Sequence, residues 1–151
     1  MSSIIVLSPN FNTTLSRVAL VSAVQTVVSQ FTTIRMNTID SDVGNNWDVS
    51  NSHYIVPSTG LYQITGTIRT DNSQHPEAPF GVGVHTENVD GNWFLRHSVQ
   101  ITINSSPNTT AYPYIRTDFF ESGQRLRMFC YAESTEPVSF IGAKLNIFRI
   151  V

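Results

Sequence analysis

Hydrophobic and polar residues alternate along the chain in short stretches, and turn-forming residues separate these stretches. Residues 53–56 form one stretch, Pro57 and Gly60 interrupt the pattern, and residues 61–69 resume it. A period of two predicts β-strands, because successive side chains of a strand point to opposite faces. The pattern predicts strands at residues 18–21, 26–31, 32–39, 53–56, 61–69, 80–87, 93–103, 111–120, 125–132 and 138–151.

The segments between these stretches carry turn chemistry. Residues 40–48 are rich in Asp, Asn and Gly, and residues 88–92 contain the Asp-Gly pair that suits a hairpin. Residues 15–28 have a nearly helical spacing of apolar positions, but their Val, Ser and Thr residues favour strands, so we expect at most a helical turn there. Eight to ten strands with regular turns predict an all-β sandwich or barrel.

The last predicted strand is apolar on both faces. Ile141, Ala143, Leu145 and Ile147 share one face. The other face carries Phe140, Gly142, Lys144, Asn146, Phe148 and Ile150. Two interpretations remain open: the strand is covered on both sides within one chain, or its second face packs against another copy.

Length, composition and charge limit the number of domains and the classes of protein to which the chain can belong. The 151 residues suffice for one domain, and we expect an N-terminal arm at residues 1–17 followed by a domain at 18–151. Basic residues are scattered and the net charge is −2, which argues against a nucleic-acid partner. We expect no signal peptide and no membrane span. Ser, Thr and Asn make up 45 residues and only 13% are charged, a composition common in virion and extracellular β proteins.

Candidate metal ligands are few. His85 and His97 can approach each other across the predicted hairpin, either as a surface pair or as a metal pair that lacks an obvious third ligand. Asp40 and Asp42 fit either a polar turn or a calcium site. We expect no cofactor.

Candidate catalytic residues are equally sparse. Cys130, the single cysteine, alternates with Leu126 and Met128 and is expected in the core. No nucleophile elbow, phosphate loop or spaced carboxylate pair is visible, so we expect a protein that is not an enzyme. Trp93, beside the turn at 90–92, is either a structural residue or a contact for a sugar ring.

Three segments resemble the tumour necrosis factor-like family, especially the globular head of complement-one-q. Residues 36–68 carry the residues typical of that family: Ile39, Gly44, Asn45, Trp47, Asp48, Tyr54, Pro57, Gly60 and Tyr62. Residues 122–132 and 139–145 are similar to two further strands of the family, although Gln124 stands where the family usually has Asp. The resemblance covers residues 18–151 in order.

This resemblance implies a jelly-roll sandwich of about ten antiparallel strands that assembles as a compact homotrimer. Tyr62 and Ile64 would then lie in the core, and Lys144 would bring three like charges together near the axis, where it must reach a carboxylate or water. The residues that the resemblance places in the trimer interface are Leu61, Gln63, Thr65, Tyr114, Phe119, Phe140, Lys144 and Phe148.

The leading hypothesis for function is a decoration, or cement, protein on the capsid of a tailed bacteriophage, because the sequence shows no secretion signal, anchor or collagen stalk. Its partners would be itself and the major capsid protein or another virion protein, and it would be made in the host cytoplasm and located on the virion. Either the arm clamps the capsid through Ile4, Ile5, Val6, Leu7 and Phe11, or it packs on its own trimer. The alternative is the receptor- or glycan-binding head of a fibre, with loops 71–79 or 104–110 as the binding site.

Overall fold

A computed structural model describes seven segments of the chain. They are residues 15–20, 25–27, 32–71, 78–87, 91–103, 109–132 and 138–150. Side chains are described for residues 32–69, 81–87, 91–95, 111, 113–131 and 141–150. None of these segments contains a helix long and apolar enough to cross a membrane.

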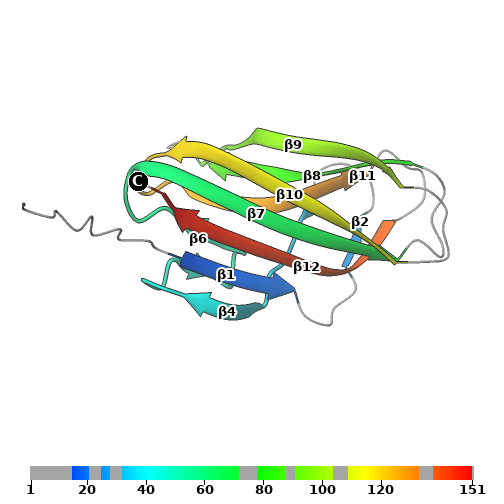
Figure 1. Ribbon diagram of the computed structural model, residues 1–151, viewed down its shortest axis with the longest axis horizontal. Coiled ribbons are helices and arrows are strands. Elements are labelled where there is room, and N and C mark those ends of the chain that lie inside the picture. The colour runs from blue at the N-terminus through cyan, green and yellow to red at the C-terminus, as the bar shows by residue number, and fades with distance from the viewer. Residues whose placement is uncertain are drawn as a thin grey trace, which may run out of the picture.

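The described segments form two antiparallel sheets packed face to face (Figure 1). The first sheet has the order β10-β7-β12-β1-β4, with β2 also paired to β12, and the second has the order β5-β6-β11-β8-β9, with β3 also paired to β11. The strands are β1 (Leu15–Leu20), β2 (Gln25–Val27), β3 (Thr32–Thr33), β4 (Thr38–Asp42), β5 (Trp47–Asp48), β6 (His53–Ile55), β7 (Gly60–Asp71), β8 (Ala78–Glu87), β9 (Trp93–Ile103), β10 (Thr109–Phe120), β11 (Arg125–Ala132) and β12 (Val138–Arg149). The all-β class and the antiparallel sandwich predicted from the sequence are therefore confirmed.

Several predicted boundaries differ from the structure, and residues 47–48 of the predicted turn form the short strand β5. The prediction of one strand over residues 32–39 was wrong, because β3 and β4 are separated by residues 34–37. In this interval Ile34 and Met36 are buried in the core, and the Ile34 amide donates a hydrogen bond to the carbonyl of Met128 at 3.0 Å. Residues 40–42 belong to β4 rather than to the turn predicted at 40–48.

The N-terminal part of the domain is extended where it is described. β1 and β2 occupy much of residues 15–28, where the sequence left room for a helical turn. β1 begins at Leu15, which pairs with Phe148 of β12, so residues 15–17 of the predicted arm belong to this strand. In the described part of the chain, the first sheet therefore begins at Leu15.

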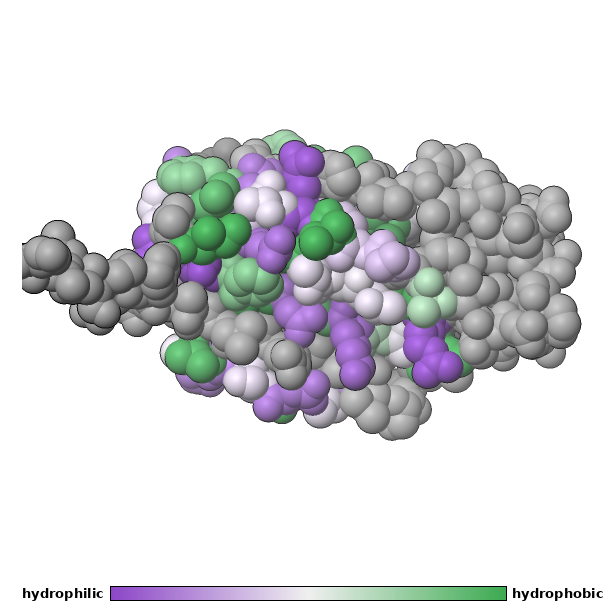
Figure 2. Space-filling view, in the orientation of Figure 1, coloured by the Kyte–Doolittle hydropathy of each residue, from purple (hydrophilic) through white to green (hydrophobic). Residues whose placement is uncertain are grey.

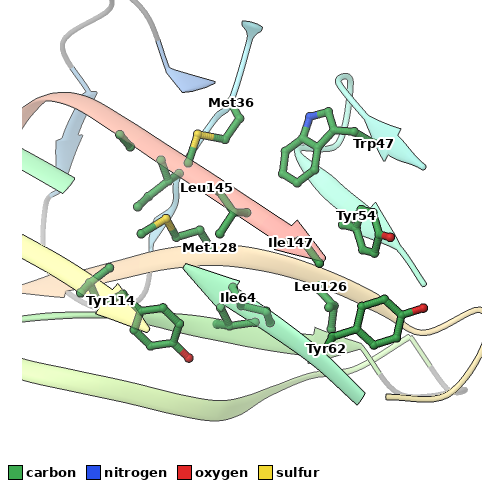
Figure 3. Close-up of a cluster of buried hydrophobic side chains, with 14 of the residues drawn as sticks. Met36, Trp47, Tyr54, Tyr62, Ile64, Tyr114, Leu126, Met128, Leu145 and Ile147 are labelled. Carbon is green, nitrogen blue, oxygen red and sulfur yellow. The ribbon is translucent and has the colours of Figure 1, made fainter. Parts of the chain in front are cut away.

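The core lies between the two sheets (Figure 3). Alternate residues of β7 and β12, among them Tyr62, Ile64, Leu145 and Ile147, face alternate residues of β11 and are almost fully buried. Leu126, Met128 and Cys130 supply the β11 side, as predicted from their spacing. The period of two thus assigned the buried face of β11 correctly, and the burial of Tyr62 and Ile64 on β7 agrees with what the resemblance implied.

The corner between β6 and β7 is fixed by hydrogen bonds to the β10–β11 turn. The Tyr62 hydroxyl donates to the carbonyl of Ser58 at 2.6 Å, which closes the corner. The Val56 amide donates to the Gln124 carbonyl at 2.9 Å, and the Gly123 amide donates to the Val56 carbonyl at 2.8 Å. The Pro57 to Gly60 corner therefore holds the turn at residues 121–124 against the end of the sandwich.

Replacing Ile64 by Ala tests the packing between the sheets, with Ile55→Ala as the matched control because Ile55 is partly exposed. We expect Ile64→Ala to lower the free energy of unfolding by about 3 kcal/mol, because it removes buried methyl groups and leaves a cavity. The control should cost under about 1 kcal/mol. Urea denaturation at equal protein concentrations measures both, and equal losses would contradict the assignment of the core.

Candidate interaction surfaces

The face of the first sheet that points away from the core is a candidate binding surface. Outward-facing residues of β10, β7 and β12 lie directly opposite one another in the strand register. They form four rows across the sheet: Phe119 and Leu61; Thr117, Gln63 and Phe148; Ile115, Thr65 and Asn146; and Pro113, Thr67 and Lys144. Figure 2 shows this face of the molecule.

One end of this face is apolar. Ile115 is 66% exposed and Phe119 is 53% exposed, and Leu61 and Phe148 are half-buried beside them. We call these four residues the outer apolar patch. Figure 2 shows hydrophobic surface gathered where β10 ends and β7 begins. Thr117 lies between Ile115 and Phe119 on β10, so the patch is interrupted by polar residues. Exposed apolar side chains gathered on one face are a candidate site of protein interaction.

The remainder of the face is neutral or basic. Asn146 donates a hydrogen bond from Nδ2 to the Thr65 hydroxyl at 3.1 Å. Lys144 and Arg69 are exposed toward the other end, and the described outward positions of β7, β10 and β12 include no Asp or Glu. A partner of this face therefore meets an apolar end and a basic end.

The interface residues predicted from the sequence fall into three groups. Six of them lie on this outer face, where they were expected: Leu61, Gln63, Thr65, Phe119, Lys144 and Phe148. Their role in a trimer stays a prediction. The side chains of Phe140 and of the predicted arm residues Ile4, Ile5, Val6, Leu7 and Phe11 lie outside the described residues.

Tyr114 is a correction to the predicted interface. Its side chain is 2% exposed and belongs to the core cluster, so it cannot contact a second copy. The reason is strand parity, because Tyr114 shares a face of β10 with the buried Phe120, while Ile115 and Phe119 share the other. Burial raises the pKa of Tyr114 to about 12. Ile115 was missed, although the same parity connects it with Phe119.

The outer face of the second sheet carries Trp93, the predicted sugar contact. The Arg127 guanidinium lies over the Trp93 ring, with 3.9 Å from Cζ to the ring centroid, and the His53 ring lies 6.2 Å away. Burial lowers the pKa of Arg127 even though Glu87 acts in the opposite direction. The guanidinium covers part of Trp93, and the sugar contact stays a prediction.

Burial lowers the pKa of two histidines on this second face. His53 Nε2 lies 3.6 Å from Asp48 Oδ2, yet burial lowers the pKa of His53 more than the Asp48 carboxylate raises it. Hydrogen bonds from Asn51 lower the pKa of Asp48 itself. His85 stacks on Phe129 with 3.9 Å between ring centroids, and burial, together with Arg127, lowers its pKa to about 4.

The candidate metal ligands are not gathered into a metal site in the described part of the chain. In the segments with described side chains, no three His, Cys, Asp or Glu residues are grouped so as to hold a metal ion. Asp42 accepts a hydrogen bond from the Trp47 amide at 2.8 Å, which closes the turn after β4. His97 lies opposite Val84 in the register, and its side chain is outside the described residues. Cys130 is fully buried, and burial raises the pKa of its thiol.

The buried His85 makes stability depend on pH. Its pKa is near 6.5 in the unfolded chain and lower in the folded one, so its stabilising contribution is complete above pH 6.5 and is lost as the pH falls toward 4. We expect a loss of about 3 kcal/mol over this interval. Denaturation of the wild type and of His85→Gln at several pH values isolates this contribution, because carboxylates titrate in both proteins. An unchanged pH dependence in the variant would show that His85 is not responsible.

Comparison with known proteins identifies the fold. No protein-family model and no curated protein matches the sequence. Among solved structures, the globular domain of the zebrafish complement 1qA protein is 11% identical over 91% of this chain and 97% of its own, with a TM-score of 0.67. The Eiger TNF of S. frugiperda is 12% identical over 91% and 94%, with a TM-score of 0.66. Murine APRIL is 13% identical over 90% and 99%, with a TM-score of 0.64.

These likenesses extend over nearly the whole of each chain, while the sequence identities are low. They show the fold alone. The chain is a jelly-roll sandwich of the type seen in tumour necrosis factors and in the globular domain of complement 1q, as the resemblance of residues 36–68 implied.

Proposed function

We propose that the chain is a non-enzymatic binding protein that acts as a homotrimer. The observation that carries this proposal is the outer apolar patch, whose Ile115 and Phe119 are more than half exposed in the single chain. A second copy that covers these side chains removes them from water, which favours association. The neutral polar rows beside the patch extend the surface without adding carboxylates that would have to lose their hydration.

A closed ring of three copies is compatible with the position of the patch. A neighbour that covers the patch with a different part of its surface forms a head-to-tail contact, and such contacts form a ring where the rotation between copies closes. The resemblance of residues 36–68 to the tumour necrosis factor-like family supports three as the number of copies. Lys144 would then lie near its equivalents, where solvent must hydrate the three ammonium groups.

The more specific part of the proposal is decoration of a tailed-phage capsid. A trimer matches the symmetry of three-fold and quasi-three-fold positions of a capsid lattice. If it binds only the assembled lattice, it stabilises that lattice by mass action. The composition, with 13% charged residues and 45 Ser, Thr and Asn residues, supports a place on the virion surface, and the partner would be the major capsid protein or another virion protein.

Phe119→Glu tests self-association, and Phe94→Glu is its matched control. Both phenylalanines are exposed to nearly the same degree, 53% and 52%, but Phe94 lies on β9 of the second sheet. We expect the wild type and the control to sediment at three times the 16.8 kDa mass of the chain. Phe119→Glu should weaken association about 100-fold or more, because it buries an unpaired charge in the contact. A wild type that sediments as a monomer at micromolar concentration would refute the trimer.

Undecorated heads of the virus that encodes the chain test the capsid role. We expect saturable co-sedimentation of the wild type with heads, with a stoichiometry in multiples of three. Phe119→Glu should bind more weakly, because a monomer loses the multivalency of the trimer. Absence of binding to heads would refute decoration, and specific, trimer-dependent signals on a glycan array would then favour a receptor- or glycan-binding head. Deletion of residues 2–10 tests the arm separately, since full affinity of the truncated trimer would refute the clamp alone.

A further inference from the structure

β8 and β10 finish, and β9 and β11 begin, at the same end of the sandwich. A groove lies at this end. Its volume is about 560 Å³, and its walls are Glu87, Gly91 and the turn at residues 121–125. This volume falls within the range of small-molecule sites in proteins. The groove lies at the end of the sandwich, whereas the outer apolar patch lies on the outer face of the first sheet, with Phe119 two residues before Glu121 of the groove.

One wall of the groove is a rigid turn. The Glu121 amide donates to Gln124 Oε1 at 2.8 Å, and the Gln124 amide donates to the Glu121 carbonyl at 3.1 Å. The Ser122 amide donates to the Thr59 hydroxyl at 3.0 Å, which ties the turn to the β6–β7 corner. Because these bonds exist without a ligand, binding has little backbone to order.

Glu87 contributes an oriented carboxylate to the groove. Glu87 Oε2 accepts from Arg125 at 2.8 Å, and the Glu87 side chain is only 11% exposed. Its other oxygen, Oε1, lies toward Gly91, where a Cβ would be 3.7 Å from it. Gly91 and Gly123 have φ values of 79° and 84°, which favour glycine. At Gly123 an added Cβ would meet no atom within 4 Å, so both glycines leave the groove open beside the polar groups.

The groove therefore presents acceptors and donors side by side. Glu87 Oε1 and the exposed Glu121 carboxylate are acceptors. Gln124 uses its Oε1 in the turn, and its Nε2 amino group takes no part in the turn's own hydrogen bonds. Arg125 uses one guanidinium nitrogen for Glu87 and has further N–H donors.

The combination of hydrogen-bond donors and acceptors in the groove indicates which class of ligand fits it. Two carboxylates repel an anion, and the guanidinium of Arg125 repels a metal ion at the same place. No large apolar side chain contributes to the described walls, so an apolar ligand would gain little. Hydroxyl groups both donate and accept hydrogen bonds, and vicinal hydroxyls match neighbouring donors and acceptors. We propose that this groove binds a neutral sugar through its hydroxyl groups, a function beyond the trimer and the capsid role and independent of both.

Protein NMR with isotope-labelled wild type tests this proposal. The probes are a panel of neutral mono- and disaccharides, with calcium chloride and sodium phosphate titrated separately. We expect at least one sugar to cause saturable shifts of the amide signals of residues 121–125 and Gly91. Shifts elsewhere, no saturable shift from any sugar, or saturation of these same signals by calcium or phosphate would each overturn the proposal.

Glu121→Ala removes one acceptor from the groove, because the turn uses only the backbone of Glu121. We expect it to weaken sugar binding at least about tenfold. Asp40→Ala is the matched control, since it removes an exposed carboxylate from β4 of the other sheet and should leave affinity unchanged. Equal affinity of all three proteins would contradict the assigned role of Glu121. Sedimentation of the same samples measures whether the protein is a trimer. A failure of sugar binding can therefore be told apart from a failure of self-association.

Discussion

The structure depends on the contact between two sheets through side chains that alternate along their strands. On β7, Tyr62, Ile64 and Ile68 point inward and are almost fully buried, and the residues between them point outward. A slip of one residue in the pairing of β7 with β12 would reverse these faces and expose the core. Burial of one face therefore fixes the register, and the register fixes which residues the protein presents to a partner.

The two outer faces differ in the contacts that their large side chains make within the chain. On the first sheet, Ile115 and Phe119 remain exposed, so the face has apolar surface available for association. On the second, Phe129 and His85 are buried and stacked, and Arg127 covers part of Trp93. On β9 of the second sheet, however, Phe94 and Leu95 are 52% and 49% exposed, so both sheets retain some uncovered apolar surface.

The β6–β7 corner links the core to the groove. Tyr62 contributes its ring to the core, where it meets Phe120 edge to face at 6.1 Å, while its hydroxyl closes the corner through Ser58. The same corner binds the 121–124 turn through Val56 and Gly123. Packing of one tyrosine thereby positions the backbone of a polar site at the end of the sandwich, where loops hold binding groups on a rigid scaffold.

The sequence by itself determined the all-β class, most strand positions and the buried face of β11, because a period of two is local and one face of each strand must be buried. The core positions of Tyr62 and Ile64 on β7 were implied by the resemblance to a known family, and for β12 the period left open which molecule covers its second apolar face. Only the tertiary structure decided that Tyr114 is buried, that residues 34–37 leave the strand, and that Arg127 stacks on Trp93. The groove likewise joins Glu87 to the 121–125 turn, more than thirty positions apart in the printed sequence. Such sites depend on contacts between distant strands, which no local pattern of residues records.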